Sequence, residues 1–192
     1  MVTHKGTQRI ETERLILRRF RVEDAQAMYD RWASDPQVTH FLTWPPHESV
    51  DSTRQLLALW EQDYEKPEHY QWAITLKEQD DLPVGSIAVV FRDDLAEKAE
   101  VGYCIGRVWW RQGITSEALA GVIGFLFEEV GMGRVEARHD VNNPNSGAVM
   151  EKCSMRKEGV MRRADHNNQG IVDVCMHAIL KDEWKKQSRE NT

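Results

Sequence analysis

The stretch from Gln71 to Gly131 constrains the fold more than any other part of the chain. Three runs, QWAITLKE, PVGSIAVVFRD and AEVGYCIG, follow a period of two and are separated by short turns, which is the pattern of consecutive β-strands. The run ITSEALAGVIGFLFEEVG comes next and is apolar on more than one face, which indicates a helix buried against a sheet. The sequence therefore predicts an antiparallel meander leading into a long helix that ends at two glycines, Gly131 and Gly133.

The segments on either side complete a mixed pattern of strands and helices. IETERLILRRF predicts a first strand, whereas VEDAQAMYDRWA and TRQLLALWEQDY carry apolar residues at helical spacing, with Asp51 or Ser52 able to cap the second helix. Beyond the long helix come a strand (VEARHDV), a short helix (NSGAVMEKCS) and two closing strands (MRKEGVMR and IVDVCMHAIL). This order predicts an α+β fold with a mixed, mostly antiparallel central sheet, helices on both of its faces and one parallel crossover.

Composition and charge narrow the class of protein. The 192 residues are enough for a single domain over residues 1–192, with residues 1–10 expected to fray. No apolar run approaches the roughly 20 residues of a membrane-spanning helix, and MVTHKGTQRI lacks the apolar centre of a secretory signal. The net charge of −6 offers no basic footprint for nucleic acid. We therefore expect a cytoplasmic protein that binds neither a membrane nor nucleic acid.

The cysteines and histidines show no pattern of a disulfide framework or a metal site. The three cysteines are widely spaced and odd in number, which favours buried, reduced thiols; they are Cys104, Cys153 and Cys175. Four histidines lack metal-ligand spacing to acidic or cysteine partners; they are His40, His69, His139 and His177. The sequence predicts no metal site.

The turn before the long helix has the residues of an anion site. About four amide donors at a helix N-terminus lack an intrahelical partner. Gly113 permits close approach of a ligand to the backbone, Arg111 adds a positive charge, and Thr115 or Ser116 adds a hydroxyl group. These features suit a phosphate or pyrophosphate, and a plainly capped helix is the alternative interpretation.

A second polar turn precedes the short helix and contains Asn143, Asn145 and Ser146. These residues also fit a simple helix cap. However, both polar turns follow predicted strands, and parallel strands would place them on the same edge of the sheet, where ligands usually bind. Their combination favours one ligand site over two unrelated caps.

Three segments together resemble the GNAT acetyltransferases, and within them the branch of ribosomal-protein N-terminal alanine acetyltransferases. They are AEVGYCIGRVWWRQGITSEA, NNPNSGAVMEKCSMRKEG and VDVCMHAILKDEW. The resemblance runs from about ETERLILR to KDEW and implies the GNAT sheet, with a splayed parallel pair of strands, and a monomer or homodimer. The family's pyrophosphate loop, Q/R-x-x-G-x-G/A, is matched at Gly113, with Trp110 in its first place and Thr115 in its last.

This resemblance implies acetyl-CoA as the cofactor and places its binding residues. The cofactor would lie across the splayed strands at Cys104, Ile105, Gly106 and Arg107. Its pyrophosphate would bind the amides of Arg111, Gln112, Gly113, Ile114, Thr115 and Ser116. Asn143 and Ser146 match the N-x-x-S element that contacts the cofactor arm or its sulfur.

Acetyl transfer needs a neutral amine, a stabilised oxyanion and a proton for the leaving thiolate. A backbone amide around Cys104 to Gly106 can stabilise the oxyanion. Where many relatives carry the tyrosine that reprotonates the thiolate, this chain has Met150. The resemblance therefore leaves Ser146 or a water molecule for that role.

Two carboxylates compete as the base that neutralises the amine. Glu100 stands where some family members carry their general base, and Asp165 where ribosomal N-terminal relatives carry an acidic catalytic residue; a surface strand residue and a turn residue are the alternatives. His166 beside Asp165 could relay protons through water. Deprotonating a chain terminus at neutral pH costs about 1 kcal/mol, and lysine about 3–4 kcal/mol more. A weak base therefore suits a terminus.

The sequence indicates the cofactor but leaves several classes of acceptor open. The resemblance places Trp44 and His47, in the WPPH segment, over the acceptor entrance. The leading hypothesis is an acetyl-CoA-dependent N-acetyltransferase acting on a primary amine, first of all a protein N-terminus, as in ribosomal-protein acetylation. The second is an acetyltransferase of a small amine, such as an aminoglycoside, a polyamine or an amino acid. The third is a non-catalytic acyl-CoA sensor, suggested by Met150.

Overall fold

The computed structural model describes residues 1–190, with side chains to residue 186. Within this range eight strands form one sheet, which confirms the predicted mixed α and β fold. In spatial order they are β1 (Ile10–Glu11), β2 (Leu15–Arg18), β3 (Gln71–Leu76), β4 (Gly85–Asp93), β5 (Lys98–Ile105), β6 (Arg134–Asp140), β8 (Gly170–Leu180) and β7 (Arg156–Asn167).

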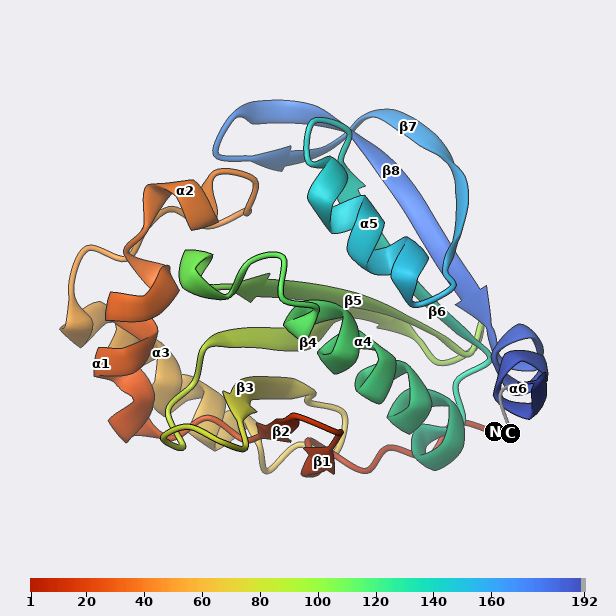
Figure 1. The fold of residues 1–192 in the computed structure, drawn as a ribbon, viewed down its shortest axis with the longest axis horizontal. Coiled ribbons are helices and arrows are strands. Elements are labelled where there is room, and N and C mark those ends of the chain that lie inside the picture. The colour runs from red at the N-terminus through yellow and green to blue at the C-terminus, as the bar shows by residue number, and fades with distance from the viewer. Residues whose placement is uncertain (191–192) are drawn as a thin grey trace.

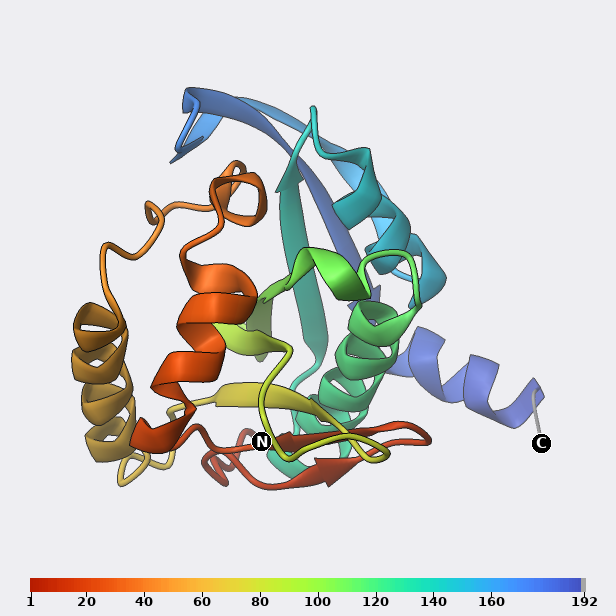
Figure 2. The same cartoon turned by 60° about the vertical axis from the view of Figure 1, so that its left-hand side comes forward.

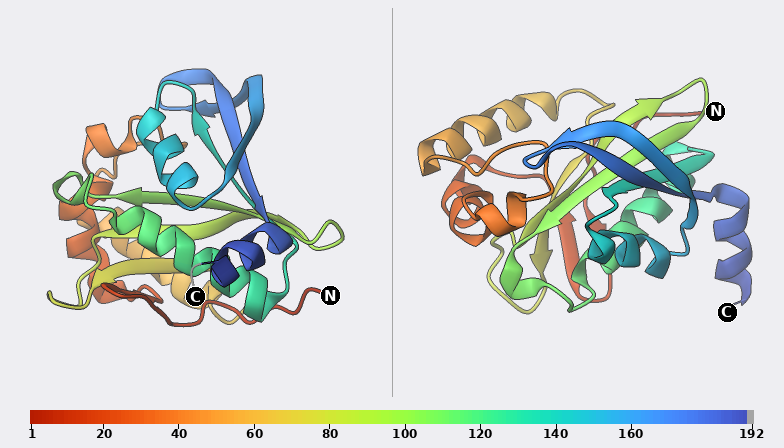
Figure 3. Two further views of the ribbon diagram at one scale, coloured as in Figure 1. Left: turned by 45° about the vertical axis from the view of Figure 1, so that its right-hand side comes forward. Right: turned by 90° about the horizontal axis from the view of Figure 1, so that it is seen from above.

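The described strands are antiparallel except for β5 and β6, the predicted crossover pair. These two strands pair in parallel over three residues each, 98–100 with 134–136. Beyond Glu100 they separate, and Figure 1 shows β5 and β8 diverging from the side of the molecule where α6 lies. Figure 3 shows the long β7–β8 hairpin rising away from β4 and β5. The sheet is therefore split along part of its length.

Helices cover both faces of the sheet, as predicted (Figure 2). On one face lie α1 (Ala25–Met28), its π-helical continuation (Tyr29–Ala33), α2 (Pro36–Thr39) and α3 (Val50–Asp63). On the other lie α4 (Ile114–Phe125), its π-helical end (Leu126–Val130) and α5 (Pro144–Lys152). Alternate residues of β3 serve the two layers, because Trp72 and Ile74 pack in the core with α4, whereas Ala73 packs with α1 and α3. The last helix, α6 (Lys181–Glu190), follows β8.

Two local expectations were wrong. The predicted first strand is a short hairpin, β1 paired with β2. The cap of α3 is Ser49, not Asp51 or Ser52, because the side chains of Ser49 and Ser52 reciprocally accept each other's backbone amides. The N-terminal segment, which is expected to fray, is hydrogen-bonded to the rest of the chain in the structure: the amide of Thr3 donates to Val130 O at 2.8 Å, and the hydroxyl of Thr7 donates to His69 O at 2.9 Å.

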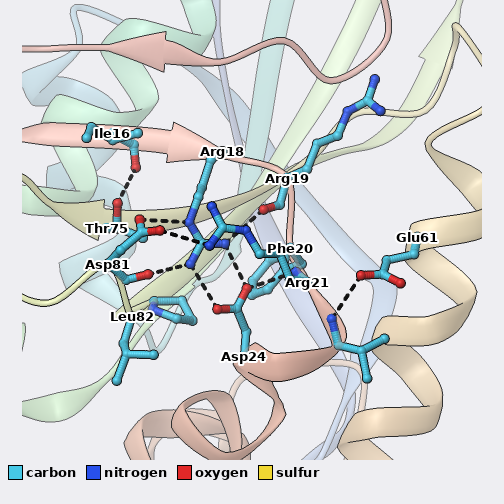
Figure 4. A network of polar contacts seen from close by, with 12 residues as sticks. Ile16, Arg18, Arg19, Phe20, Arg21, Asp24, Glu61, Thr75, Asp81 and Leu82 are labelled. Atoms are coloured by element: carbon cyan, nitrogen blue, oxygen red, sulfur yellow. Dashed lines mark hydrogen bonds and ion pairs between the residues drawn. The ribbon is translucent and has the colours of Figure 1, made fainter.

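A buried ion pair joins β2 to the first helical layer (Figure 4). The guanidinium group of Arg18, which is 5% exposed, donates to both carboxylate oxygens of Asp24 at 2.7 and 2.9 Å. Its Nε also donates to Asp81 Oδ1 at 3.0 Å, in the turn between β3 and β4. The Arg18 side chain thereby connects strand β2 to the 3-10 turn η1 (Val22–Asp24) and to the β3–β4 turn.

No helix in the described part of the chain is long and apolar enough to cross a membrane.

Candidate active site

A cleft of about 970 Å³ opens where β5 and β6 separate. Its walls come from β5, the end of β6, the turn before α4, the start of α5 and the tip of the β7–β8 hairpin. Residues 41–44 and His47, which connect α2 to α3, also line it and contact the hairpin tip, where the amide of Asn168 donates to Leu42 O at 3.1 Å. The two polar turns predicted from the sequence therefore face the same cleft.

The turn before α4 presents unpaired backbone donors to this cleft. Arg111 (φ 61°) and Gly113 (φ 76°) both adopt the left-handed conformation, which turns successive amides in one direction. The first amide that bonds back to the turn is that of Glu117, which donates to Gly113 O at 3.1 Å. Among the described residues, the amides of residues 111–116 have no hydrogen-bond acceptor. This arrangement fits an anion with several oxygens.

Two cations that the sequence pattern did not indicate lie beside the same turn. Arg14 donates to Gln112 O at 3.1 Å and to the carboxylate of Glu117 at 2.6 Å, so it braces the turn from the β1–β2 hairpin. Lys152, in the last turn of α5, lies so near that a Cβ atom added to Gly113 would be 3.2 Å from its Nζ. With Arg111 they make a locally positive site in a chain of net charge −6. Arg14 and Lys152 are distant in sequence from the loop, so no local motif could identify them.

Most of the residues predicted for the cofactor line the cleft. They are Cys104, Ile105, Arg111, Gly113, Ile114, Thr115, Ser116, Asn143 and Ser146. The side chains of Arg107 and Gln112 point elsewhere: Arg107 pairs with Asp35 at the start of α2, and Gln112 donates to Val108 O at 2.7 Å. Gly106 packs under Trp109 and Arg31 O, where a Cβ atom would clash. These three residues shape the turn without facing the cleft.

The split in the sheet also frees amides on β5. The amide of Gly106 donates to Val84 O at 2.9 Å, so it is not free to bind an oxyanion. Since alternate residues of a strand direct their amides to opposite sides, those of Tyr103 and Ile105 point toward the gap between β5 and β6. They lie beyond the last parallel pair at Glu100.

The two predicted base candidates share one guanidinium group. Arg138 Nε lies 3.0 Å from Glu100 Oε1 and 3.2 Å from Asp165 Oδ2. Glu100 is 6% exposed. Burial raises its pKa above the ordinary glutamate value, and the nearby carboxylates of Glu136 and Asp165 act in the same direction, against the attraction of Arg138. A raised pKa makes Glu100 a better proton acceptor near neutral pH.

Asp165 reaches this cluster because the β7–β8 ladder is irregular. The register shifts between Met161 and Asp165, and the intervening Arg163 adopts a φ of 50°. The Arg163 amide donates to Asp173 Oδ1 at 2.8 Å, which holds the distortion in place. Bulges of this kind redirect side chains. Asp165 is thus a strand residue beside a bulge and not part of a simple turn, whereas its neighbour His166 is largely exposed.

Ser146 has a partner that the sequence did not indicate. The hydroxyl of Tyr103 lies 2.9 Å from Ser146 O and 3.0 Å from Ser146 Oγ. Asn143 caps α5 by accepting the Ser146 amide, so the serine is fixed from two sides. Burial raises the pKa of Tyr103, so its phenol stays protonated at neutral pH. Met150, in the place of the usual tyrosine, is buried in the core under α5.

The two residues predicted to lie over the acceptor entrance are both at the cleft. Trp44 and His47 both line the cleft, with ring centroids 5.3 Å apart. His47 Nδ1 lies 2.7 Å from Thr53 Oγ1, and burial lowers the pKa of His47 below its usual value. A neutral, oriented imidazole therefore stands at this side of the cleft.

Two of the three cysteines are poorly suited to act as nucleophiles. Cys104, Cys153 and Cys175 are all free thiols. Burial raises the pKa of Cys104, the thiol that lines the cleft, and raises that of Cys153 to about 12. These two thiols are therefore protonated and poorly reactive at neutral pH.

Comparison with known proteins agrees with this geometry. The chain matches the acetyltransferase (GNAT) domain family over residues 14–156. It is 31% identical over 173 residues to the uncharacterized N-acetyltransferase p20 of Bacillus licheniformis, which covers 90% of this chain and 96% of that protein. The ribosomal-protein-serine acetyltransferase of Escherichia coli (strain K12) is 28% identical over 104 residues, or 54% of this chain and 58% of that protein.

A solved structure shows the same fold. The microcin C7 self-immunity acetyltransferase MccE, determined in complex with acetyl-CoA and AMP, superimposes with a TM-score of 0.77 at 18% identity. The superposition covers 88% of this chain and 93% of that chain.

Proposed function

Because the chain belongs to the GNAT acetyltransferase family, we propose that it transfers the acetyl group of acetyl-CoA to a primary amine, first of all the α-amine of a protein N-terminus. The observation that carries this proposal is the turn at residues 111–116, where unpaired amides face a cleft that also contains buried carboxylates.

The residues of this turn fit the diphosphate of coenzyme A. Its oxygens would bind the amides of residues 111–116, and Arg14, Arg111 and Lys152 would balance its charge. Bound acetyl-CoA supplies the activated acetyl thioester. The amides of Tyr103 and Ile105 would stabilise negative charge on the acetyl oxygen.

The remaining chemistry is proton transfer by the chain's own residues. Glu100 accepts the proton of the incoming ammonium group, directly or through water, and Arg138 keeps the resulting carboxyl group in position. Ser146 would donate its hydroxyl proton to the departing sulfur; Tyr103 would restore that proton and take one from water in turn, or water would restore it directly. Asp165 remains the second candidate for the base, because it reaches the same guanidinium group.

An α-amine is the acceptor best matched to this machinery. Its reference pKa of roughly 7.7–8 leaves only about 1 kcal/mol for a carboxylate base to supply at neutral pH, against roughly 4–5 kcal/mol for a lysine side chain. The relative in Escherichia coli carries the name ribosomal-protein-serine acetyltransferase. Both points favour a polypeptide N-terminus, with a ribosomal protein as the first case to test.

An amine panel tests the acceptor. Free thiol released from acetyl-CoA should rise with a peptide that begins with alanine or serine, and should not rise with the same peptide blocked at its N-terminus. Turnover with small amines alone would favour the small-amine enzyme. Tight binding of acetyl-CoA without turnover for any amine would favour a sensor.

Gly113→Val tests the cofactor turn. Valine strongly disfavours a φ of 76°, and its side chain would project toward Lys152. Affinity for acetyl-CoA, measured by calorimetry, should fall at least tenfold, and circular dichroism should show that the fold is kept. Unchanged affinity would remove the turn from the proposed site.

A further inference from the structure

We propose that His139, Cys175 and His177 form a binding site for a divalent transition metal, with Zn²⁺ as the preferred ion, between the sheet and α5. The sequence predicts no metal site, because these residues lie on two strands far apart along the chain. None of the three residues is assigned a role in acetyl transfer, although His139 also lines the cleft.

The strand register brings the three side chains to one face of the sheet. In the antiparallel β6–β8 pair, His139 is directly opposite Cys175, and His177 is two residues further along β8. Residues i and i+2 of a strand share a face. One ligand atom of each side chain lies within 4.8 Å of the others, and Cys175 Sγ is 3.9 Å from His177 Nδ1. A tetrahedral zinc ion would hold a thiolate sulfur and an imidazole nitrogen about 3.6 Å apart, so small side-chain rotations complete the site.

Each histidine has an oxygen beside the nitrogen that would face away from the metal. His139 Nδ1 lies 2.8 Å from Asp140 O. When Nδ1 carries the proton and donates it to this carbonyl, Nε2 has a free lone pair for the metal. His177 Nε2 lies 3.8 Å from Glu151 Oε1. Metal-bound histidines usually donate their second nitrogen to such a carbonyl or carboxylate.

The surroundings of His177 suggest that this side chain does more than fill space in the core. This residue is 1% exposed, and its Nε2 has no hydrogen-bond partner among the described residues, because Glu151 lies beyond bonding distance. An unpaired buried nitrogen costs about 1–3 kcal/mol. A metal ion at Nδ1 would fix the ring and favour a short bond from Nε2 to Glu151.

Helix α5 leaves room for the imidazole of His139 only because residue 147 is glycine. A Cβ atom there would be 2.8 Å from His139 Nε2. The set of one thiol and two imidazoles suits Zn²⁺ or Co²⁺ better than Mg²⁺ or Ca²⁺, which prefer oxygen. On binding, the Cys175 thiol would release its proton to solvent, and water would supply the fourth ligand.

Cobalt titration of the purified full chain tests the site directly. Metal-free protein should bind one equivalent of Co²⁺ and show a thiolate-to-cobalt charge-transfer band together with the intense visible bands of a tetrahedral ion. Zn²⁺ should displace the cobalt and should raise the thermal midpoint by about 3 °C or more.

Matched variants assign the ligands. Cys175→Ser should abolish the charge-transfer band, and Cys153→Ser, which removes a thiol on the far side of α5 from the cluster, should retain it. If Cys175→Ser fails to fold, His139→Gln, at a half-buried position, should still weaken cobalt binding at least tenfold. The absence of a thiolate band in the folded parent chain, or an unchanged band in Cys175→Ser, would overturn the proposal.

Discussion

At the scale of single residues, Glu100 experiences two opposed electrostatic effects. Its side chain is almost fully buried on β5, which favours the neutral acid, and it lies 3.0 Å from the Arg138 guanidinium group, which favours the carboxylate. Burial is the larger effect, so the pKa of Glu100 is raised. Because only the ionised form accepts a proton, activity that depends on Glu100 should fall as the pH drops through this raised pKa.

Glu100→Gln should therefore lower turnover by about 10²-fold at neutral pH, within the usual range for loss of a general base. Acetyl-CoA affinity should change little, because the residue lies away from the turn at 111–116. Steady-state rates against pH test this, with Asp165→Asn as the matched control on the same guanidinium group. Two results would assign the role of general base to Asp165 instead. In one, the dependence of turnover on pH in Glu100→Gln matches that of the parent chain. In the other, the fall in turnover at low pH disappears only in Asp165→Asn.

Tyr103 offers a second test at this scale. Tyr103→Phe keeps the ring but removes the hydroxyl group 3.0 Å from Ser146 Oγ. We expect kcat to fall about tenfold with little change in the KM for acetyl-CoA, since a hydrogen bond of this kind is worth roughly 0.5–1.5 kcal/mol. If Tyr103 acts through Ser146, the double variant with Ser146→Ala should be no slower than Ser146→Ala alone. Additive losses would contradict that coupling.

At the scale of the elements, the Arg18 ion pair adds a polar connection between elements that the sheet already brings close, because β2 pairs with β3. The short strand β2, the turn η1 and the β3–β4 turn converge on one buried guanidinium group. The two carboxylates differ in environment, because the Asp24 side chain is 4% exposed and that of Asp81 is 53% exposed. Their energetic contributions should differ accordingly.

Asp24→Ala leaves a buried cation without its bidentate partner and should lower the free energy of unfolding by about 3–5 kcal/mol. Asp81→Ala removes an exposed partner and should cost about 1 kcal/mol or less. Urea unfolding monitored by circular dichroism measures both. Equal losses would show that the pair with Asp24 has no special contribution.

At the scale of the whole molecule, the sequence predicted the order of elements and the split sheet better than it predicted contacts. The period-two runs mark strands because one face of each strand is buried, as in β3, and Gly131 ends the long helical segment with a φ of 88°. The helix α6 was missed because its residues are largely polar and charged. With so few apolar residues, this segment offers little apolar spacing by which a helix can be recognised.

The candidate site also contains some residues that the sequence could indicate and others that it could not. The turn at residues 111–116 and Ser146 could be predicted because helix starts have local signatures. Arg138, which joins both base candidates, could not be, because it meets Glu100 only through the parallel pairing of β5 with β6. Tyr103 and Ser146 are likewise 43 residues apart along the chain, so the packing of α5 beside the sheet, and not a local motif, brings them together.

The short parallel pairing of β5 with β6 has a consequence for solvent. Amide hydrogens held in a ladder exchange slowly with deuterium, whereas those of Tyr103 and Ile105, beyond the last pair at Glu100, have no strand partner on that side. In the free protein we expect these two amides to exchange much faster than that of Gly106, which donates to Val84 O. Addition of acetyl-CoA should slow the exchange of these two amides selectively. Hydrogen–deuterium exchange, followed by NMR or mass spectrometry, would therefore detect the filling of the gap between β5 and β6.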